Sequence, residues 1–157
     1  MNRRIVFISA LLVAGILFVV GRGHSQNESA PKRRAINLQD KVVQAPFSNA
    51  ILSGDTLYVS GNIGIDPKTG KPPAKIEDEI KLLLDGYKAT LAQANMTMDD
   101  LAYVQIFCSD LTYFEQFNSI YKTYFTKDYP ARAFIGAGSL LRGGHFELQG
   151  IAVRGQH

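Results

Sequence analysis

Hydrophobic and polar positions alternate with two different periods along most of this chain, and these periods predict strands and helices in a definite order. Apolar side chains at helical spacing predict one helix over residues 76–93 and a second over residues 114–124. Strands are predicted from period-two alternation at residues 49–52, 56–63, 101–109, 131–137 and 145–154. The order β-β-α-β-α-β-β, with a further strand possible before residue 45, predicts an α+β fold with two helices against one mixed sheet.

The predicted sheet is apolar on both faces. In the last strand, Phe146 and Leu148 point to one face while Ile151 and Val153 point to the other. The strand at residues 101–109 is also apolar on both faces. Val104 and Ile106 are expected on one face, and Leu101, Tyr103 and Phe107 on the other. Two helices can cover only one face, so a homo-oligomer that packs sheet faces together is expected.

The first 25 residues differ from the rest. A basic start at residues 2–4 is followed by an uncharged apolar run over residues 5–20 and by small and polar residues to Ser25. This layout predicts a signal peptide cleaved after Ser25, or else an uncleaved N-terminal anchor that would be the only membrane contact. Either form predicts an exported domain, periplasmic or secreted. Residues 26–40 are expected to be a polar linker and residues 41–157 the folded domain.

Charge, cysteine and histidine usage exclude several classes of site. Three of the 17 Lys and Arg residues lie within residues 1–25, whereas all 14 Asp and Glu residues lie beyond them, so the remainder is formally neutral. A neutral domain without a basic stripe argues against nucleic acid as a partner, and the cluster at residues 32–34 is expected to be solvated linker. The single cysteine, Cys108, allows no internal disulfide and is expected to be a small buried hydrophobe. No cluster has metal-ligand spacing, and His145 is expected to be exposed.

Two charged residues interrupt otherwise apolar strands near the end of the chain. Arg132 lies in the strand at residues 131–137, and Glu147 lies in the last strand. Removing either group from water is costly unless it is paired or used. An interstrand or intersubunit salt bridge would account for both residues. Alternatively, the guanidinium binds the carboxylate of a ligand and Glu147 orients a water in a shared pocket where subunits meet.

Several short motifs, in order and over about residues 35–154, resemble the Rid (YjgF-type) family of reactive intermediate deaminases. They are Ala45-Pro-Phe-Ser-Asn-Ala50, Leu57-Tyr-Val-Ser-Gly-Asn-Ile63, Asp66-Pro-Lys-Thr-Gly70, Phe117-Asn-Ser-Ile-Tyr-Lys-Thr-Tyr-Phe125, Tyr129-Pro-Ala-Arg132 and Phe146-Glu-Leu-Gln-Gly-Ile-Ala-Val153. The resemblance implies a chorismate-mutase-like fold and a homotrimer with pockets between subunits. It also implies hydrolysis of 2-imino acids, such as 2-iminopropanoate and 2-iminobutanoate, to 2-keto acids and ammonia with no cofactor or metal.

The resemblance also assigns roles to residues of this chain. Arg132 would bind the substrate carboxylate, and Glu147 would hold the water that attacks the imine carbon. Ser60 and Gly61 would line the pocket, and Asn118 would form a hydrogen bond within it.

Two further pocket positions depart from the usual family pattern. Phe47 replaces a usual tyrosine and so lacks a hydroxyl, and Phe134 occupies a position that is often cysteine or another small residue. A second acidic position near the end is Gln149. These differences keep open an alternative function, binding of a small carboxylate such as a keto acid without turnover. Ribonuclease activity, suggested by older names of some relatives, is disfavoured by the neutral charge of the domain.

Overall fold

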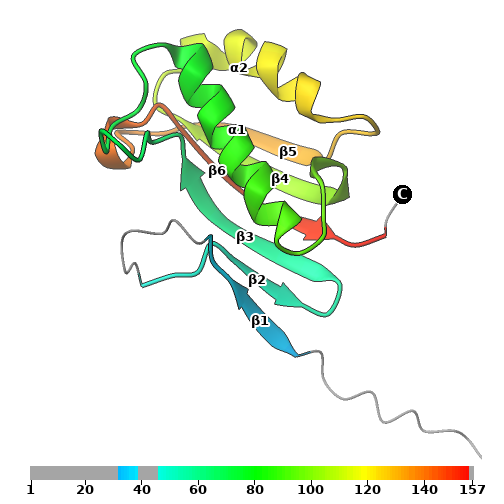
Figure 1. Ribbon diagram of the computed structural model, residues 1–157. Helices are drawn as coiled ribbons and strands as arrows, with labels where there is room; N and C mark the ends of the chain where they lie inside the picture. Colours follow the sequence, from blue (N-terminus) through cyan, green and yellow to red (C-terminus); the bar gives the residue numbers. More distant parts are fainter. Residues whose placement is uncertain (1–31, 39–45, 156–157) are drawn as a thin grey trace, which may run out of the picture.

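The computed structural model describes residues 32–38 and 46–155, in which six strands form one sheet with two α-helices on the same face (Figure 1). The strands are β1 (Arg33–Ile36), β2 (Ala50–Ser53), β3 (Thr56–Ile63), β4 (Leu101–Cys108), β5 (Ala131–Gly136) and β6 (Phe146–Val153). The helices are α1 (Ile76–Ala92) and α2 (Phe114–Tyr121). Short 3-10 turns occupy Met98–Asp100, Leu111–Tyr113, Lys122–Tyr124 and Leu141–Gly143.

The sheet is mixed, as the sequence predicts. Its spatial order is β1-β2-β3-β6-β4-β5, and every neighbouring pair is antiparallel except β4 and β5, which are parallel. The crossover from β4 to β5 contains α2, consistent with the need of parallel strands for a long connection. β5 is therefore an edge strand with one side of its backbone unpaired in the sheet, which places Arg132 at the rim.

The N-terminal strand was only partly anticipated. Residues 33–36, which were expected to lie in a polar linker, form β1 and pair with β2. Ile36 is buried, while the other three residues of the strand are exposed. A strand with only one inward-facing apolar residue shows no clear alternation in the sequence. β1 therefore could not be distinguished from a polar linker. The predicted N-terminal segment at residues 1–25 lies outside the described residues.

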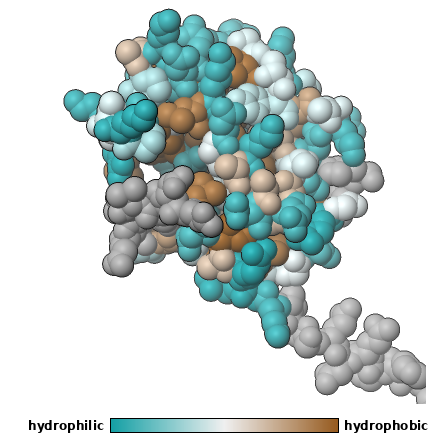
Figure 2. Space-filling model, viewed as in Figure 1, coloured by the Kyte–Doolittle hydropathy of each residue, from teal (hydrophilic) through white to brown (hydrophobic). Residues whose placement is uncertain are grey.

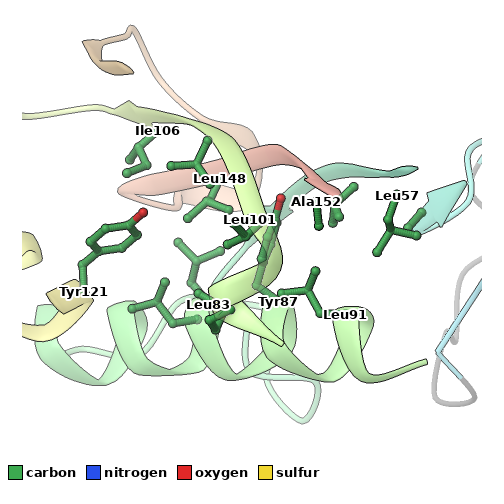
Figure 3. Close-up of a cluster of buried hydrophobic side chains, with 14 of the residues drawn as sticks. Leu57, Leu83, Tyr87, Leu91, Leu101, Ile106, Tyr121, Leu148 and Ala152 are labelled. Carbon is green, nitrogen blue, oxygen red and sulfur yellow. The ribbon is translucent and has the colours of Figure 1, made fainter. Parts of the chain in front are cut away.

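The core lies between the helices and the sheet. The apolar stripe predicted for α1 is confirmed, since Leu83, Tyr87 and Leu91 are fully buried. Figure 3 shows these side chains directed at Leu148 and Ala152 of the sheet. Burial of the two helix stripes on one side of the sheet is the main apolar contribution to stability, at roughly 25 cal/mol per Å² removed from water.

One side chain of the sheet lies on a different face from the one predicted. Leu101 was expected opposite Val104, but both side chains are buried in the core. The pairing of β4 with β6 shifts register between Leu101 and Tyr103, so one extra residue is accommodated there. An extra residue in one strand reverses which face the side chains before it occupy. A prediction based on strict alternation cannot include this change of face.

The helix-bearing side of the molecule is mostly hydrophilic. Figure 2, in the same view as Figure 1, shows hydrophobic residues there only in small separate patches. Within residues 32–38 and 46–155, no helix combines the length and the apolar character of a membrane span.

Tyr87 presents a test of packing in this core. Its hydroxyl is buried without a hydrogen-bond partner among the described residues, and burial raises the pKa of this phenol well above its usual range. An unsatisfied buried hydroxyl costs free energy, so we expect Tyr87→Phe to raise the midpoint of thermal unfolding by about 2–4 °C at fixed protein concentration. The matched control is Tyr124→Phe, which removes a hydroxyl that lies 2.9 Å from Asp85 Oδ1 and should give no such gain. A lower midpoint for Tyr87→Phe would show that its hydroxyl is satisfied.

Candidate functional site

Arg132 points to the helix-bearing side of the sheet. It pairs in register with Val104 of β4, whose side chain is fully buried in the core, and paired residues of neighbouring strands point to the same face. Because β5 is an edge strand, the long side chain reaches the margin of α2. Its guanidinium carbon lies 5.0 Å from the ring centre of Tyr121, 5.7 Å from that of Phe134 and 5.9 Å from that of Phe114. These aromatic faces stabilise the cation without neutralising it.

The guanidinium has no acidic partner nearby. In the described part of the chain, no carboxylate lies within salt-bridge distance of Arg132. A cation that is partly buried and lacks a carboxylate partner can bind an anionic ligand. The salt bridge with Glu147, one of the two explanations left open by the sequence, is not formed within this chain.

An open pocket of about 360 Å³ lies beside Arg132. Its lining residues are Asn118, Tyr121, Lys122, Tyr129, Pro130 and Arg132. The lining has two cations, one amide and no acid, between aromatic walls. This composition suits a small organic anion, with donors at one end and apolar surface at the other. Tyr121 is nearly fully buried, and its burial raises the pKa of its hydroxyl, although nearby Arg132 opposes that change.

Phe134 lies next to this pocket. Its ring centre lies 5.0 Å from that of Phe114 and 5.4 Å from that of Phe117, in edge-to-face arrangements that tie β5 to α2. The ring is thus fixed by the core and fills space beside the guanidinium. Together we call Arg132, Asn118 and Phe134 the Arg132 cluster.

Glu147 points to the other face of the sheet. It pairs with Ile63 of β3 and Phe107 of β4, and Phe107 lies between Ile106 and Cys108, which are both fully buried on the helix side. The carboxylate of Glu147 extends over Gly61, so close that a Cβ atom at Gly61 would overlap its Oε1. The absence of a side chain at Gly61 is therefore what allows the carboxylate to lie against the sheet.

A β-bulge in β3 shapes the surroundings of Glu147. The pairing with β6 shifts between Val59 and Asn62, which leaves Ser60 and Gly61 outside the regular ladder. Ser60 Oγ donates to the carbonyl of Ser48 at 2.7 Å, and Ser60 N donates to the carbonyl of Asn49 at 3.0 Å. These bonds fasten the segment that begins at Phe47, which is 54% exposed. Glu147, Gly61, Ser60 and Phe47 form a second group, which we call the Glu147 cluster.

The two clusters do not meet within one chain. Arg132 and Glu147 lie on opposite faces of the sheet and on strands separated by β4. Strand spacing puts them roughly 10 Å apart across the sheet and roughly 10 Å apart along it. The sequence-based expectation of one shared cavity is therefore not met by a single copy. Any site that contains both groups must bring together surfaces of two copies.

The face that carries Glu147 has a row of apolar side chains beside the hydrogen-bonded pair Gln105 and Gln149, and no helix of the described residues covers it. Cross-strand register aligns Ile51, Tyr58, Ile151 and Tyr103 in one row on this face. Tyr58 is 51% exposed and Tyr103 is 38% exposed, and Ile135 adds a further exposed side chain near Phe107. Both helices lie on the opposite side (Figure 1). We call this surface the outer face; exposed apolar side chains grouped in this way are typical of protein-contact surfaces.

Two residues of structural importance were missed in the sequence. Glu79, for which the sequence indicated no role in a site, is fully buried and binds His145, which was expected to be exposed and is half-buried. A signal was present, because Glu79 lies three residues after Ile76 and four before Leu83, within the apolar stripe of α1.

Cys108 is fully buried, as predicted. Burial raises the pKa of its thiol, and Sγ lies 3.0 Å from the carbonyl oxygen of Asp110. Such a thiol is a poor nucleophile at neutral pH. The described residues also contain no group of three or more His, Cys, Asp or Glu side chains arranged to hold a metal ion.

Comparison with known proteins identifies the family. Residues 38–154 match the family described as Endoribonuclease L-PSP, which is the Rid (YjgF-type) family that the sequence resembles. The chain belongs to the Rid family. It is similar to the 2-iminobutanoate/2-iminopropanoate deaminases of Bos taurus, 33% identical over 111 residues, and of Rattus norvegicus, 36% identical over 110 residues. These matches cover 70% and 69% of this chain and 81% and 80% of the relatives.

The fold agrees with that of solved Rid structures. The crystal structure of the YjgF gene product of E. coli superposes with a TM-score of 0.71 at 28% identity, covering 77% of this chain and 98% of that one. The predicted chorismate-mutase-like α+β fold is thus confirmed. The family match over residues 38–154 includes every predicted site residue.

The prediction of an exported protein, periplasmic or secreted, is wrong on this comparison. The Rid relatives that identify the chain include deaminases of Bos taurus and Rattus norvegicus, and mammalian cells have no periplasm. The family match also begins at residue 38, so it does not include the apolar run from which export was inferred. That run lies outside the described residues.

Gly61 provides a test of the Glu147 cluster. We expect Gly61→Ala to displace the Glu147 carboxylate by roughly 1–2 Å, because the new methyl group takes its place. Crystal structures of the two proteins measure the displacement. Gly138→Ala is the matched control, since a Cβ there meets nothing within 4 Å. An unmoved carboxylate in Gly61→Ala would contradict this account of the contact.

Proposed function

We propose that this protein hydrolyses small 2-imino acids to 2-keto acids and ammonia, at sites shared between the copies of a homotrimer. The observation that carries the proposal is the placement of Arg132 and Glu147. A guanidinium without a carboxylate partner opens into a pocket on one face, and a carboxylate lies over a glycine on the other. The deaminase names of the Bos taurus and Rattus norvegicus relatives support the substrate class.

Assembly supplies what one copy lacks. Neither helix of residues 32–38 and 46–155 covers the exposed apolar side chains of the outer face, whereas Arg132 lies at the β5 edge. Packing the β5 edge and α2 of one copy against the outer face of the next buries the exposed tyrosines and brings the two clusters together. Closing a ring of three copies repeats this contact three times, with one site at each boundary.

The proposed reaction depends more on positioning the imino acid and a water than on activating a strong nucleophile. Arg132 binds the carboxylate of the imino acid through two parallel hydrogen bonds, with Asn118 in the same pocket as a further polar contact. Glu147 accepts a proton from a water as its oxygen attacks C2 of the protonated imine, and a carbinolamine forms. Glu147 then gives this proton to the nitrogen, the C–N bond breaks, and the hydroxyl becomes the keto group as its proton leaves with the ammonia. The residues present are sufficient for each of these steps.

A second candidate is a binding protein for small carboxylates that does not turn them over. Phe134 favours it, because its ring is fixed against Phe114 and Phe117 beside the guanidinium, where the family pattern has a small residue. A thermal shift with 2-oxobutanoate that Arg132→Ala abolishes, together with no release of keto acid from imines, would support this function over deamination.

Single substitutions test the two proposed roles. With imines generated in situ by an amino-acid oxidase, we expect Arg132→Ala to lower kcat/KM roughly 100-fold through lost carboxylate binding, and Glu147→Gln to lower kcat roughly 100-fold through lost proton transfer. Arg33→Ala and Glu77→Gln, which alter exposed residues of the same types outside α2 and β5, are the matched controls. Full activity in either site variant would refute its assigned role.

Mixed trimers test whether the site is shared. Arg132→Ala and Glu147→Gln subunits, unfolded together and refolded, should regain about a quarter of wild-type activity, because one boundary in four then has both native groups. The same mixture without refolding, in which subunits do not exchange, is the control. If the groups acted within one chain, the refolded mixture would stay as inactive as its parents.

A further inference from the structure

The buried carboxylate of Glu79 joins three segments at one end of the sheet. Its Oε1 accepts hydrogen bonds from the backbone N–H of His145 at 2.6 Å and of Phe146 at 3.3 Å, and its Oε2 lies 2.6 Å from His145 Nδ1. A fully buried carboxylate is costly unless several donors satisfy it, and three donors do so here. A carboxylate only accepts, so the short contact assigns the proton to Nδ1 of His145.

Two glycines allow the segments around Glu79 to pack closely. A Cβ at Gly64, just after β3, would lie 3.0 Å from Glu79 Cγ and would overlap the Glu79 backbone. A Cβ at Gly144 would overlap Ile63 and lie 3.7 Å from Glu79 Oε1. The end of β3, the start of β6 and the first turn of α1 therefore converge on Glu79.

The same contacts hold the start of β6 from both sides. The peptide unit that joins His145 to Phe146 has its carbonyl bound by Ser109 N at 3.0 Å and its N–H bound by Glu79. Glu147 is the next residue, and its partner in β3 is Ile63. Strand ends fray when their polar groups lose partners, and fraying here would free Phe146 and leave Glu147 as the terminal paired residue of β6, with less restraint on its place over Gly61.

We infer that Glu79 and His145 are positioning residues that hold Glu147 in the geometry required to orient the attacking water. The ring of His145, whose centre lies 5.5 Å from that of Tyr113, is itself held in place by an edge-to-face contact. The role of the attacking water in this inference rests on the proposed function. The placement of the Glu147 carboxylate can be tested even if the protein is not a deaminase.

The kinetic test separates positioning from substrate binding. We expect Glu79→Ala to lower kcat about 100-fold and Glu79→Gln, which keeps one acceptor oxygen, about 10-fold. His145→Phe, which keeps the contact with Tyr113 but loses the ring N–H, should also lower kcat about 10-fold. KM and the dissociation constant of 2-oxobutanoate should stay within about two-fold in all three, because Arg132 belongs to the other cluster. Glu77→Gln is the matched control, since Glu77 lies in the same helical turn but is exposed and bound only to Gln116.

Each other outcome has a definite meaning. If kcat of Glu79→Gln and His145→Phe equals that of Glu77→Gln, the inference is overturned. If kcat and 2-oxobutanoate affinity fall together, the contact serves the fold as a whole and the inference is again overturned. If the wild-type protein does not deaminate imines, the proposed function fails. Crystal structures of Glu79→Gln and His145→Phe then show whether these two residues hold the Glu147 carboxylate in place. A Glu147 carboxylate displaced from Gly61 would support the positioning role, and an unmoved one would reject it.

Discussion

The constraint on which the rest of this structure depends is the period of two along its strands. Alternation puts Val104 and Arg132 on the helix-bearing face, and it puts Phe107 and Glu147 on the other. A one-residue shift of β6 would turn Glu147 toward the core, and a one-residue shift of β5 would turn Arg132 away from the helices. The separation of the two charged groups is therefore a direct consequence of the register that buries the core. A site that contains both groups therefore requires two copies of the chain.

The two charged groups are held in different ways at two places in the sheet. At the β5 edge, aromatic rings from α2 surround Arg132 and leave its donors open to the pocket. At the start of β6, Glu79 satisfies backbone groups that no strand pairs with, and so fixes the residue next to Glu147. In both places a helix controls the position of a strand residue. The helices thus do more than cover the core, since each determines the geometry of one of the charged groups.

Much of the fold follows from local pattern, and much of the site does not. The α1 stripe and the β3 strand were predicted to within a residue or two, because long periodic segments determine them. β1 was hidden by its basic composition, and the position of Leu101 by a register irregularity that only the β6 partner creates. Arg132 and Glu147 were recognised in the sequence as candidate site residues because they interrupt apolar strands and lie within the family motifs. Their opposite faces could have been found only from strand pairing, which depends on contacts far apart in sequence. The burial of Glu79 was not predicted, because three consecutive acids at residues 77–79 fit the dipole of a first helical turn and the partners of Glu79 lie 66 and 67 residues away in sequence.

The separation of the two charges also suits the proposed substrate class, small 2-imino acids. A guanidinium and a carboxylate placed together in one chain would neutralise each other and exclude a ligand. Kept on opposite faces, each retains access to water until a second copy closes the site. A protonated 2-imino acid has an anionic carboxylate and a cationic nitrogen, so it offers a complementary charge to each group as water is expelled. The keto acid product has lost the cationic nitrogen and with it the attraction to Glu147. Release of product is thereby favoured by the same electrostatics that bind the substrate.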